Sequence, residues 1–153
     1  MKLGAIYSKE KTTFTLFSPV ADSVFVIFYD KGNDSAEKGR LEMMRGEGEL
    51  RSIFSATAEG NLDGVYYTYE VHTSDGTFSS HDPYARACGV NGHRSMVIDL
   101  SKTDPDGFAD EDRPKLADPM SMIITEVSVA DVSAGASAHS RYPGKFKAFT
   151  EDK

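Results

Sequence analysis

Short extended segments separated by turn residues run through the first 100 positions, and this spacing most constrains the fold. Val24 to Tyr29 (VFVIFY) is apolar on both faces, as in a central strand. Thr12 to Phe17 alternates apolar and polar residues. Ser74 to Thr77 (SDGT) predicts a hairpin, with Gly76 accepting the positive φ of a type I′ turn. No segment before residue 100 has helical periodicity, so the pattern predicts an all-β sandwich.

The remaining expected strands fall at similar intervals, and a linker follows them. They are residues 41–45, 50–57, 65–73, 77–80 and 95–100, with a polar loop over 30–39. Leu100 to Pro119 then carries three prolines and six acidic residues but few large apolar ones, which predicts an extended linker. We therefore expect a β-sandwich over residues 1–117 and a C-terminal extension over 118–153, extended or irregular in structure.

Composition excludes several classes of partner. The formal net charge of −7 and the pI near 5.0 argue against nucleic acid, which requires a basic stripe. No apolar run approaches the roughly 18 residues of a membrane-spanning helix, so no membrane partner is expected. The first residues lack the apolar core of a signal peptide, which leaves the localisation undefined. Cys88 is the single cysteine and excludes an internal disulfide; we expect it to be packed in a loop.

The segment Ile123–Ser133 (IITEVSVADVS) has the composition of a buried strand that opens a larger domain, yet the sequence ends 20 residues later. The residues after it are small and polar, and three aromatic residues are available to anchor them: Tyr142, Phe146 and Phe149. A strand with an unpaired edge can pair with a second copy, so a homodimer through this segment is one expectation.

Three runs of the sequence carry a resemblance to a known family: residues 3–24, 63–71 and 81–100, the last reading HDPYARACGVNGHRSMVIDL. In this order they resemble the N-terminal module of bacterial type I pullulanases, over residues 3 to about 150. The resemblance implies an immunoglobulin-like β-sandwich of carbohydrate-binding module family 48 (isoamylase N-terminal-like), which precedes a glycoside hydrolase family 13 barrel. It therefore implies a module of a starch- or glycogen-debranching enzyme, with that barrel as a partner.

The segment Ile123–Ser133 resembles the first strand of that barrel, which in the family reads YEVHVRDFS. Four positions carry small residues where the family has Tyr, His, Arg and Phe, namely Thr125, Ser128, Ala130 and Val132. Smaller side chains suit a segment that is not enclosed in a barrel interior. Because a (β/α)8 barrel takes about 250 residues, residues 118–153 correspond to its truncated start alone.

The resemblance also bears on catalysis. The family cleaves α-1,6 linkages with an Asp, a Glu and a second Asp on later barrel strands, and none has a counterpart in this sequence. Glu126 and Asp131 are the nearest carboxyls by position. In an extended strand about 17 Å would separate them, whereas retaining glycoside hydrolysis needs carboxyls about 5 Å apart. We predict no catalytic residue and no enzymatic activity in this chain.

Other constellations of reactive side chains favour structural interpretations. Ser79 to Asp82 (SSHD) holds the residue types of a catalytic triad, but neighbours along a strand diverge, so we interpret it as a strand end and turn. Four aspartates around Gly107 miss the EF-hand spacing and are interpreted as a solvated linker: Asp104, Asp106, Asp110 and Asp112. The histidines have no metal-ligand spacing, so no metal or cofactor is predicted.

Sugar-binding modules stack aromatic rings on glucose units, which makes the strand VYYTYEVHT the candidate site. If Tyr67 and Tyr69 fill the core, Tyr66 lies on the solvent side with Thr68 beside it. Family members bind glycogen-like chains largely through paired tryptophans and a lysine, whereas this sequence has no Trp. Two hypotheses stay open: an accessory domain that packs beside a barrel, and an independent α-glucan-binding module that uses Tyr66 and Thr68.

Overall fold

The computed structural model describes residues 2–112 and 115–151. The chain divides into two compact units, Met1–Ala109 and Asp110–Lys153, each described by itself below. The division lies within the linker expected between Leu100 and Pro119. The assignment of residues 1–117 and 118–153 as separate domains stays a prediction.

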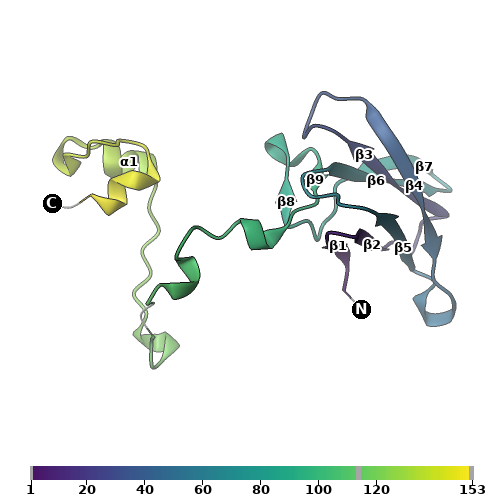
Figure 1. The fold of residues 1–153 in the computed structure, drawn as a ribbon, viewed down its shortest axis with the longest axis horizontal. Coiled ribbons are helices and arrows are strands. Elements are labelled where there is room, and N and C mark those ends of the chain that lie inside the picture. The colour runs from purple at the N-terminus through teal and green to yellow at the C-terminus, as the bar shows by residue number, and fades with distance from the viewer. Residues whose placement is uncertain (1, 113–114, 152–153) are drawn as a thin grey trace. The chain divides into compact units, whose positions relative to one another are not determined.

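The first unit is a strongly curled antiparallel sheet (Figure 1). Its strands are β1 (Gly4–Tyr7), β2 (Lys11–Phe17), β3 (Ser23–Tyr29), β4 (Glu37–Arg45), β5 (Ile53–Glu59), β6 (Tyr66–Thr73), β7 (Gly76–Ser80), β8 (Ala87–Cys88) and β9 (Ser95–Met96). They follow the order β1-β2-β5-β4-β3-β6-β9-β8, and β7 pairs with β6. β4 pairs with β3 along most of its length and with β5 through Met44 and Arg45, so it joins the two halves of the sheet. The predicted all-β, sandwich-like fold is confirmed.

The differences from the predicted strands lie at turns and edges. The hairpin between β6 and β7 is present, but its turn is not type I′, because Gly76 has a positive φ of 135° while Ser74 and Asp75 do not. Instead, the hydroxyl of Thr73 accepts a hydrogen bond from the Asp75 amide at 3.2 Å. β4 begins at Glu37, inside the expected polar loop. The short strands β1 and β8 were not predicted, and the strand expected over residues 95–100 ends at Met96.

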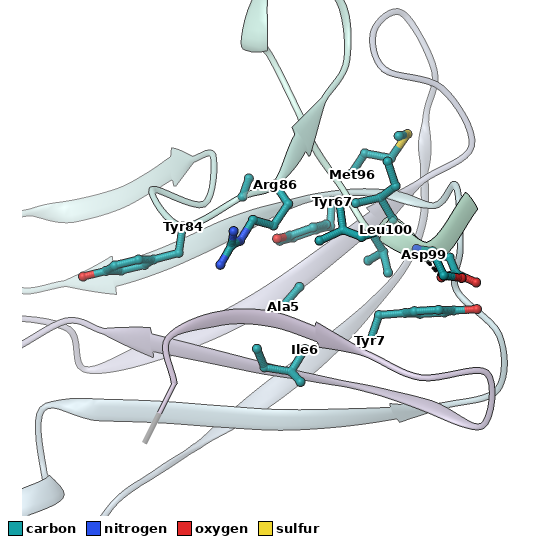
Figure 2. Close-up of a pocket in the computed structure, with 13 residues that line it drawn as sticks. Ala5, Ile6, Tyr7, Tyr67, Tyr84, Arg86, Met96, Asp99 and Leu100 are labelled. Carbon is teal, nitrogen blue, oxygen red and sulfur yellow. Dashed lines mark hydrogen bonds between the residues drawn. The ribbon is translucent and has the colours of Figure 1, made fainter. Parts of the chain in front are cut away.

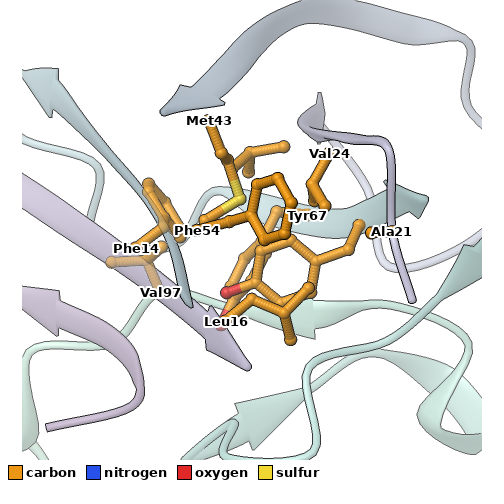
Figure 3. Packing of buried hydrophobic residues seen from close by; sticks show 10 residues of the cluster. Phe14, Leu16, Ala21, Val24, Met43, Phe54, Tyr67 and Val97 are labelled. Atoms are coloured by element: carbon orange, nitrogen blue, oxygen red, sulfur yellow. The ribbon is translucent and has the colours of Figure 1, made fainter. Parts of the chain in front are cut away.

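Aromatic side chains fill the core between the two halves of the sheet (Figure 3). Phe14 of β2 and Tyr67 of β6 are fully buried, and their rings meet edge to face with centroids 5.0 Å apart. Tyr69 is 1% exposed and packs its ring against that of Tyr67 at 5.8 Å. Phe54 and Met43 contribute from β5 and β4. Tyr67 and Tyr69 therefore face the core, as the alternation along their strand predicts.

A buried carboxylate ties the end of this core to the following turn. Asp82 is 2% exposed, and its Oδ2 accepts hydrogen bonds from the hydroxyls of Tyr67 at 2.7 Å and Tyr69 at 3.2 Å. Its Oδ1 accepts from the Tyr84 amide at 2.8 Å. Burial first, and then the charge of Asp82, raise the pKa of both phenols, so they stay neutral donors. The segment Ser79 to Asp82 is thus a strand end and turn, as predicted.

Besides the strands, the described residues form seven short 3-10 helices and one α-helix. The 3-10 helices are Gly48–Leu50, Val90–Gly92, Leu100–Lys102, Phe108–Asp110, Pro119–Ser121, Ala136–Ala138 and Phe146–Thr150, and α1 is Val129–Ala134.

In the second unit, the prediction of a buried strand over 123–133 is wrong. Ile123 is 95% exposed, and no described residue pairs with it as a strand neighbour. The chain enters α1 at Val129, where the hydroxyl of Ser128 accepts a hydrogen bond from the Asp131 amide at 3.4 Å. An isolated strand leaves its backbone groups unpaired. An N-terminal Ser and an acidic first turn, by contrast, favour a helix.

Candidate functional site

The predicted site lies on the outer face of β3 and β6, defined here by Phe25, Tyr29, Tyr66, Thr68 and His72. The register places Tyr66 opposite Tyr29 and Thr68 opposite Ile27. Because side chains alternate along a strand, these residues lie on the face opposite to the core. Tyr66 and Thr68 thus lie on the face opposite to the core, as the alternation along the strand predicts. Their role in sugar binding stays a prediction.

Neither predicted residue is fully open. Tyr66 is half-buried, and its ring lies close to Gly32, where an added Cβ would stand 3.0 Å from the ring and 2.7 Å from the Cα of Gly89. Thr68 is 5% exposed, and its hydroxyl shares a hydrogen bond of 3.3 Å with the hydroxyl of Tyr29. A ligand on this face would meet part of the Tyr66 ring and would reach Thr68 only beside Tyr29.

Arginine side chains cover the other rings of the outer face. The guanidinium of Arg94 lies 3.5 Å from the ring centre of Tyr29, and it donates to the carbonyl of Lys31 at 2.7 Å and to the hydroxyl of Ser35 at 2.8 Å. This cation–π contact closes one face of the Tyr29 ring.

Charged groups on the outer face also bond to one another. Arg40 bonds to Glu37 at 2.8 Å and to Glu70 at 3.2 Å, and Glu70 lies 2.9 Å from the ring nitrogen of His72. The hydrogen bond to Arg40 lowers the pKa of Glu37, and the same bond raises the pKa of Arg40. The polar groups of the outer face are thus largely satisfied within the module.

A second concave region was not predicted from the sequence. We call it the β1 cleft: a hollow of about 320 Å³ lined by β1, by the turn Tyr84–Arg86 and by residues 96–101. Figure 2 shows Tyr84 at one end of the cleft and Tyr7 near the other, with Arg86 between them. Tyr84 is 49% exposed, and Ile6 and Leu100 are similarly open. These side chains come from separate segments, so no local pattern marks them together.

Asp99 lines the β1 cleft near Tyr7, and Asp63 is hydrogen-bonded to the backbone of Asp99. Asp99 accepts hydrogen bonds from the amide of Ser101 at 3.1 Å and from its hydroxyl at 2.6 Å, which lower the pKa of Asp99. Asp63 accepts from the Asp99 amide at 2.8 Å and from Lys102 at 2.6 Å; the Lys102 bond, followed by the amide bond, lowers its pKa. Burial and the two carboxylates raise the pKa of Tyr7, so its hydroxyl stays protonated and donates to Asn61 at 3.0 Å.

The other candidate groups form no metal centre within residues 2–112 and 115–151, where no three His, Cys, Asp or Glu side chains are grouped to hold an ion. Cys88 is exposed in β8, which corrects the expectation that it is packed in a loop. No helix in the described ranges has the length and apolar character needed to cross a membrane.

The comparisons with known proteins agree with the fold. Residues 2–85 match the family model of carbohydrate-binding module 48, the isoamylase N-terminal domain. The chain therefore belongs to the carbohydrate-binding module 48 family, and the predicted resemblance is confirmed.

Its relatives are pullulanases. The chain is 27% identical to the pullulanase of Bacillus subtilis over 151 residues, which is 98% of this chain and 20% of that protein. It is 31% identical to pullulanase A of Streptococcus pneumoniae serotype 4 over 116 residues, which is 71% of this chain and 9% of that protein. The chain thus spans between about a tenth and a fifth of these relatives.

Solved structures extend the similarity to both units. The pullulanase from Bacillus acidopullulyticus is 35% identical with a TM-score of 0.86, over 98% of this chain and 18% of that one. The pullulanase from Paenibacillus barengoltzii, in complex with maltohexaose and α-cyclodextrin, is 34% identical with a TM-score of 0.86, over 99% of this chain and 23% of that one. This chain corresponds to one module of those enzymes.

Proposed function

We propose that the chain acts as a noncatalytic accessory module of a pullulanase-like α-glucan debranching enzyme, packing beside a catalytic barrel. The observation that carries this proposal is a structural match to two solved pullulanases, each with a TM-score of 0.86. The match covers nearly the whole of this chain and about a fifth of the length of each enzyme. A module of this kind shapes the approach of the substrate to a barrel instead of cleaving the substrate itself.

The carboxylates of the second unit do not suggest a hydrolytic pair. Glu126 is exposed in an extended stretch, and Asp131 lies in the first turn of α1. Retaining hydrolysis requires two carboxyls about 5 Å apart that flank one sugar linkage. The parent enzyme would carry its catalytic residues on later barrel strands.

Residues 118–153 fit the role of a barrel's first segment. Their apolar side chains are open: Met120 is 88% exposed, Ile123 95%, Ile124 83% and Phe146 83%. Three of these side chains lie within residues 120–124, and exposed apolar groups so close together call for a covering partner. A (β/α)8 barrel of about 250 residues would supply neighbouring strands for them.

Mixing this chain with a barrel tests the proposal. A Paenibacillus barengoltzii pullulanase from which the matching region has been deleted would serve as the partner, with size-exclusion chromatography as the readout. We expect a one-to-one complex and a higher unfolding temperature for the barrel. Absence of a complex at micromolar concentrations would argue against the accessory role.

A second candidate function is α-glucan binding on the outer face of β3 and β6, through Tyr66 and Thr68. The half-open ring of Tyr66 and the hydroxyls of Thr68 and Tyr29 favour it. Aromatic stacking contributes about 0.5–1.5 kcal/mol per ring, so one partly covered tyrosine predicts weak binding. Calorimetric titration with maltoheptaose tests it, and Tyr66→Ala should weaken the affinity.

The homodimer expected from an unpaired strand also stays a proposal. The exposed side chains of Ile123 and Ile124 support it, although the segment is not a strand in the single chain. Sedimentation equilibrium at high concentration tests it, and a monomer throughout would remove the proposal.

A further inference from the structure

We propose that the β1 cleft binds a short segment of α-glucan, at a site separate from Tyr66 and Thr68. The ligand class rests on the proposed function, since it follows from the carbohydrate-binding family to which the chain belongs. The observation behind the location is a contrast between two surfaces. The arginines of the outer face are bonded within the module, whereas Tyr84 and Arg86 offer open groups in the β1 cleft.

The size of the β1 cleft suits a small part of a sugar chain. Its volume of about 320 Å³ lies at the lower end of the range for ligand pockets, about 300–1,000 Å³. The rings of Tyr84 and Tyr7 stand near its two ends (Figure 2). Rings spaced along a groove can each stack on the apolar face of a sugar unit. The cleft thus offers apolar contact without being a purely apolar groove.

Hydrogen-bonding groups in the β1 cleft are available to a ligand. Arg86 is exposed, and its guanidinium forms no hydrogen bond, ion pair or ring contact with any residue in 2–112 or 115–151. The Tyr84 hydroxyl likewise has no hydrogen-bond partner among those residues. A guanidinium offers five N–H donors in a fixed fork, and sugar hydroxyls and ring oxygens accept such bonds.

The walls of the β1 cleft are held in place before any ligand binds. The buried Asp82 carboxylate accepts the Tyr84 amide at 2.8 Å, and the Asp82 carbonyl accepts the Ala85 amide at 3.1 Å. On the opposite wall, Gly4 has a φ of +88°, and an added Cβ there would stand 2.8 Å from the Cβ of Tyr84. Glycine thus allows β1 to approach the turn directly. Groups that are positioned in advance lose less entropy on binding.

The charges around the β1 cleft favour a neutral ligand. Two charged residues line the cleft, Arg86 and Asp99. Lys102 and Asp63, which do not line it, are bonded to each other at 2.6 Å. The formal charges cancel, so neither a phosphate nor a polycation is specifically attracted. A neutral, hydroxyl-rich ligand is the class that matches this balance.

Calorimetric titration of the full 153-residue chain with maltoheptaose tests the proposal. Arg86→Gln and Tyr84→Ala should each weaken binding about tenfold, since bonds to a charged group and ring stacking each contribute on this scale. Tyr66→Ala reports on the outer face, because a loss of affinity in this variant would place the sugar at Tyr66 and not in the β1 cleft. Arg51→Gln is the matched control, because Arg51 is an exposed arginine outside the cleft. Urea unfolding of each variant verifies its fold. If Tyr84→Ala does not fold, the result for Arg86→Gln decides the test, because Arg86 is exposed and has no partner among the described residues.

The possible outcomes distinguish a failure of the β1 cleft as the binding site from a failure of glucan binding itself. Loss of affinity in Arg86→Gln, but not in Arg51→Gln or Tyr66→Ala, supports the β1 cleft. Loss in Tyr66→Ala with Arg86→Gln unchanged overturns the cleft and keeps glucan binding on the outer face. No heat from the unaltered chain at millimolar sugar overturns both glucan sites, and the accessory role is then tested by the barrel experiment alone.

Discussion

The two units of the chain differ in how they satisfy their backbone and apolar groups. In Met1–Ala109, every strand has an antiparallel neighbour and Phe14 and Tyr67 are fully buried. In Asp110–Lys153, the described residues form short helical turns, and Ile123 and Phe146 are more than four-fifths exposed. Similar apolar side chains thus contribute to stability in one unit and remain open in the other. Strand pairing, more than residue type, makes the difference.

The largest expected effect comes from exchanging one phenylalanine in each unit. Phe14→Ala should lower the free energy of unfolding by about 3–5 kcal/mol, because it removes a ring from the centre of the core. Phe146→Ala should change it by less than about 0.5 kcal/mol, since that side chain is 83% exposed. Urea denaturation followed by circular dichroism measures both. Equal effects would show that the second unit has a core of its own.

A smaller but still large effect is expected at the buried carboxylate. Asp82→Ala leaves the hydroxyls of Tyr67 and Tyr69 without their acceptor and should cost about 3 kcal/mol. Asp82→Asn keeps one acceptor oxygen and should cost less. As a control in the second unit, Asp131→Ala should have little effect on the same urea transition. If Asp82→Ala were as stable as the parent, the carboxylate would not be holding the core to the turn.

Deleting the second unit should have only a small effect on the stability of the first. A chain ending at Ala109 should keep its unfolding free energy within about 1 kcal/mol of the full chain, because the strand pairs and the core cluster lie in residues 4–97. Differential scanning calorimetry measures this. A fall of several kcal/mol would mean that residues 110–153 stabilise the sheet.

The smallest expected effect is the change of folding stability with pH that arises from Asp63 and Lys102. The pKa of Asp63 is lowered in the folded state, chiefly by its bond to Lys102. The contribution of the Asp63 carboxylate to folding stability is therefore fully present above its pKa in the unfolded chain, about 3.9. It is lost as the pH falls through the pKa of the folded state. The pKa of Lys102 is raised, so its contribution is lost as pH rises past about 10.4.

Thermal unfolding at pH 7 and at pH 3 measures the acid side of this dependence. Asp63→Asn should reduce the drop in melting temperature between the two values. An unchanged drop would mean that the bond between Asp63 and Lys102 contributes nothing to the acid sensitivity.

The sequence predicts the central strands well because their patterns are long. β2, β3 and β6 each hold seven or eight residues with clear alternation or continuous apolar character. β8 has two residues, too few for any period, and β1 has four. The segment 123–133 shows the limit of propensity: its β-branched residues favour a strand, but a strand forms only where a neighbour can pair with it.

The two proposed binding surfaces are predictable from the sequence to different degrees. Alternation along β6 places Tyr66 and Thr68 on the outer face, but it does not reveal that Gly32 and Arg94 cover that face from distant loops. The β1 cleft depends on the close approach of Gly4 to Tyr84, 80 residues later in the chain. Contacts of such separation follow from the completed sheet and leave no local mark in the sequence.

Hydrogen exchange with mass spectrometry tests most directly whether the second unit is completed only by a barrel. The amides of residues 122–134 would be followed in the chain alone and in the presence of the trimmed Paenibacillus barengoltzii barrel, with β2 as the internal reference. We predict fast exchange over 122–134 in the chain alone and marked protection after the barrel is added, while β2 is protected in both. Protection of 122–134 equal to that of β2 in the chain alone would contradict this prediction.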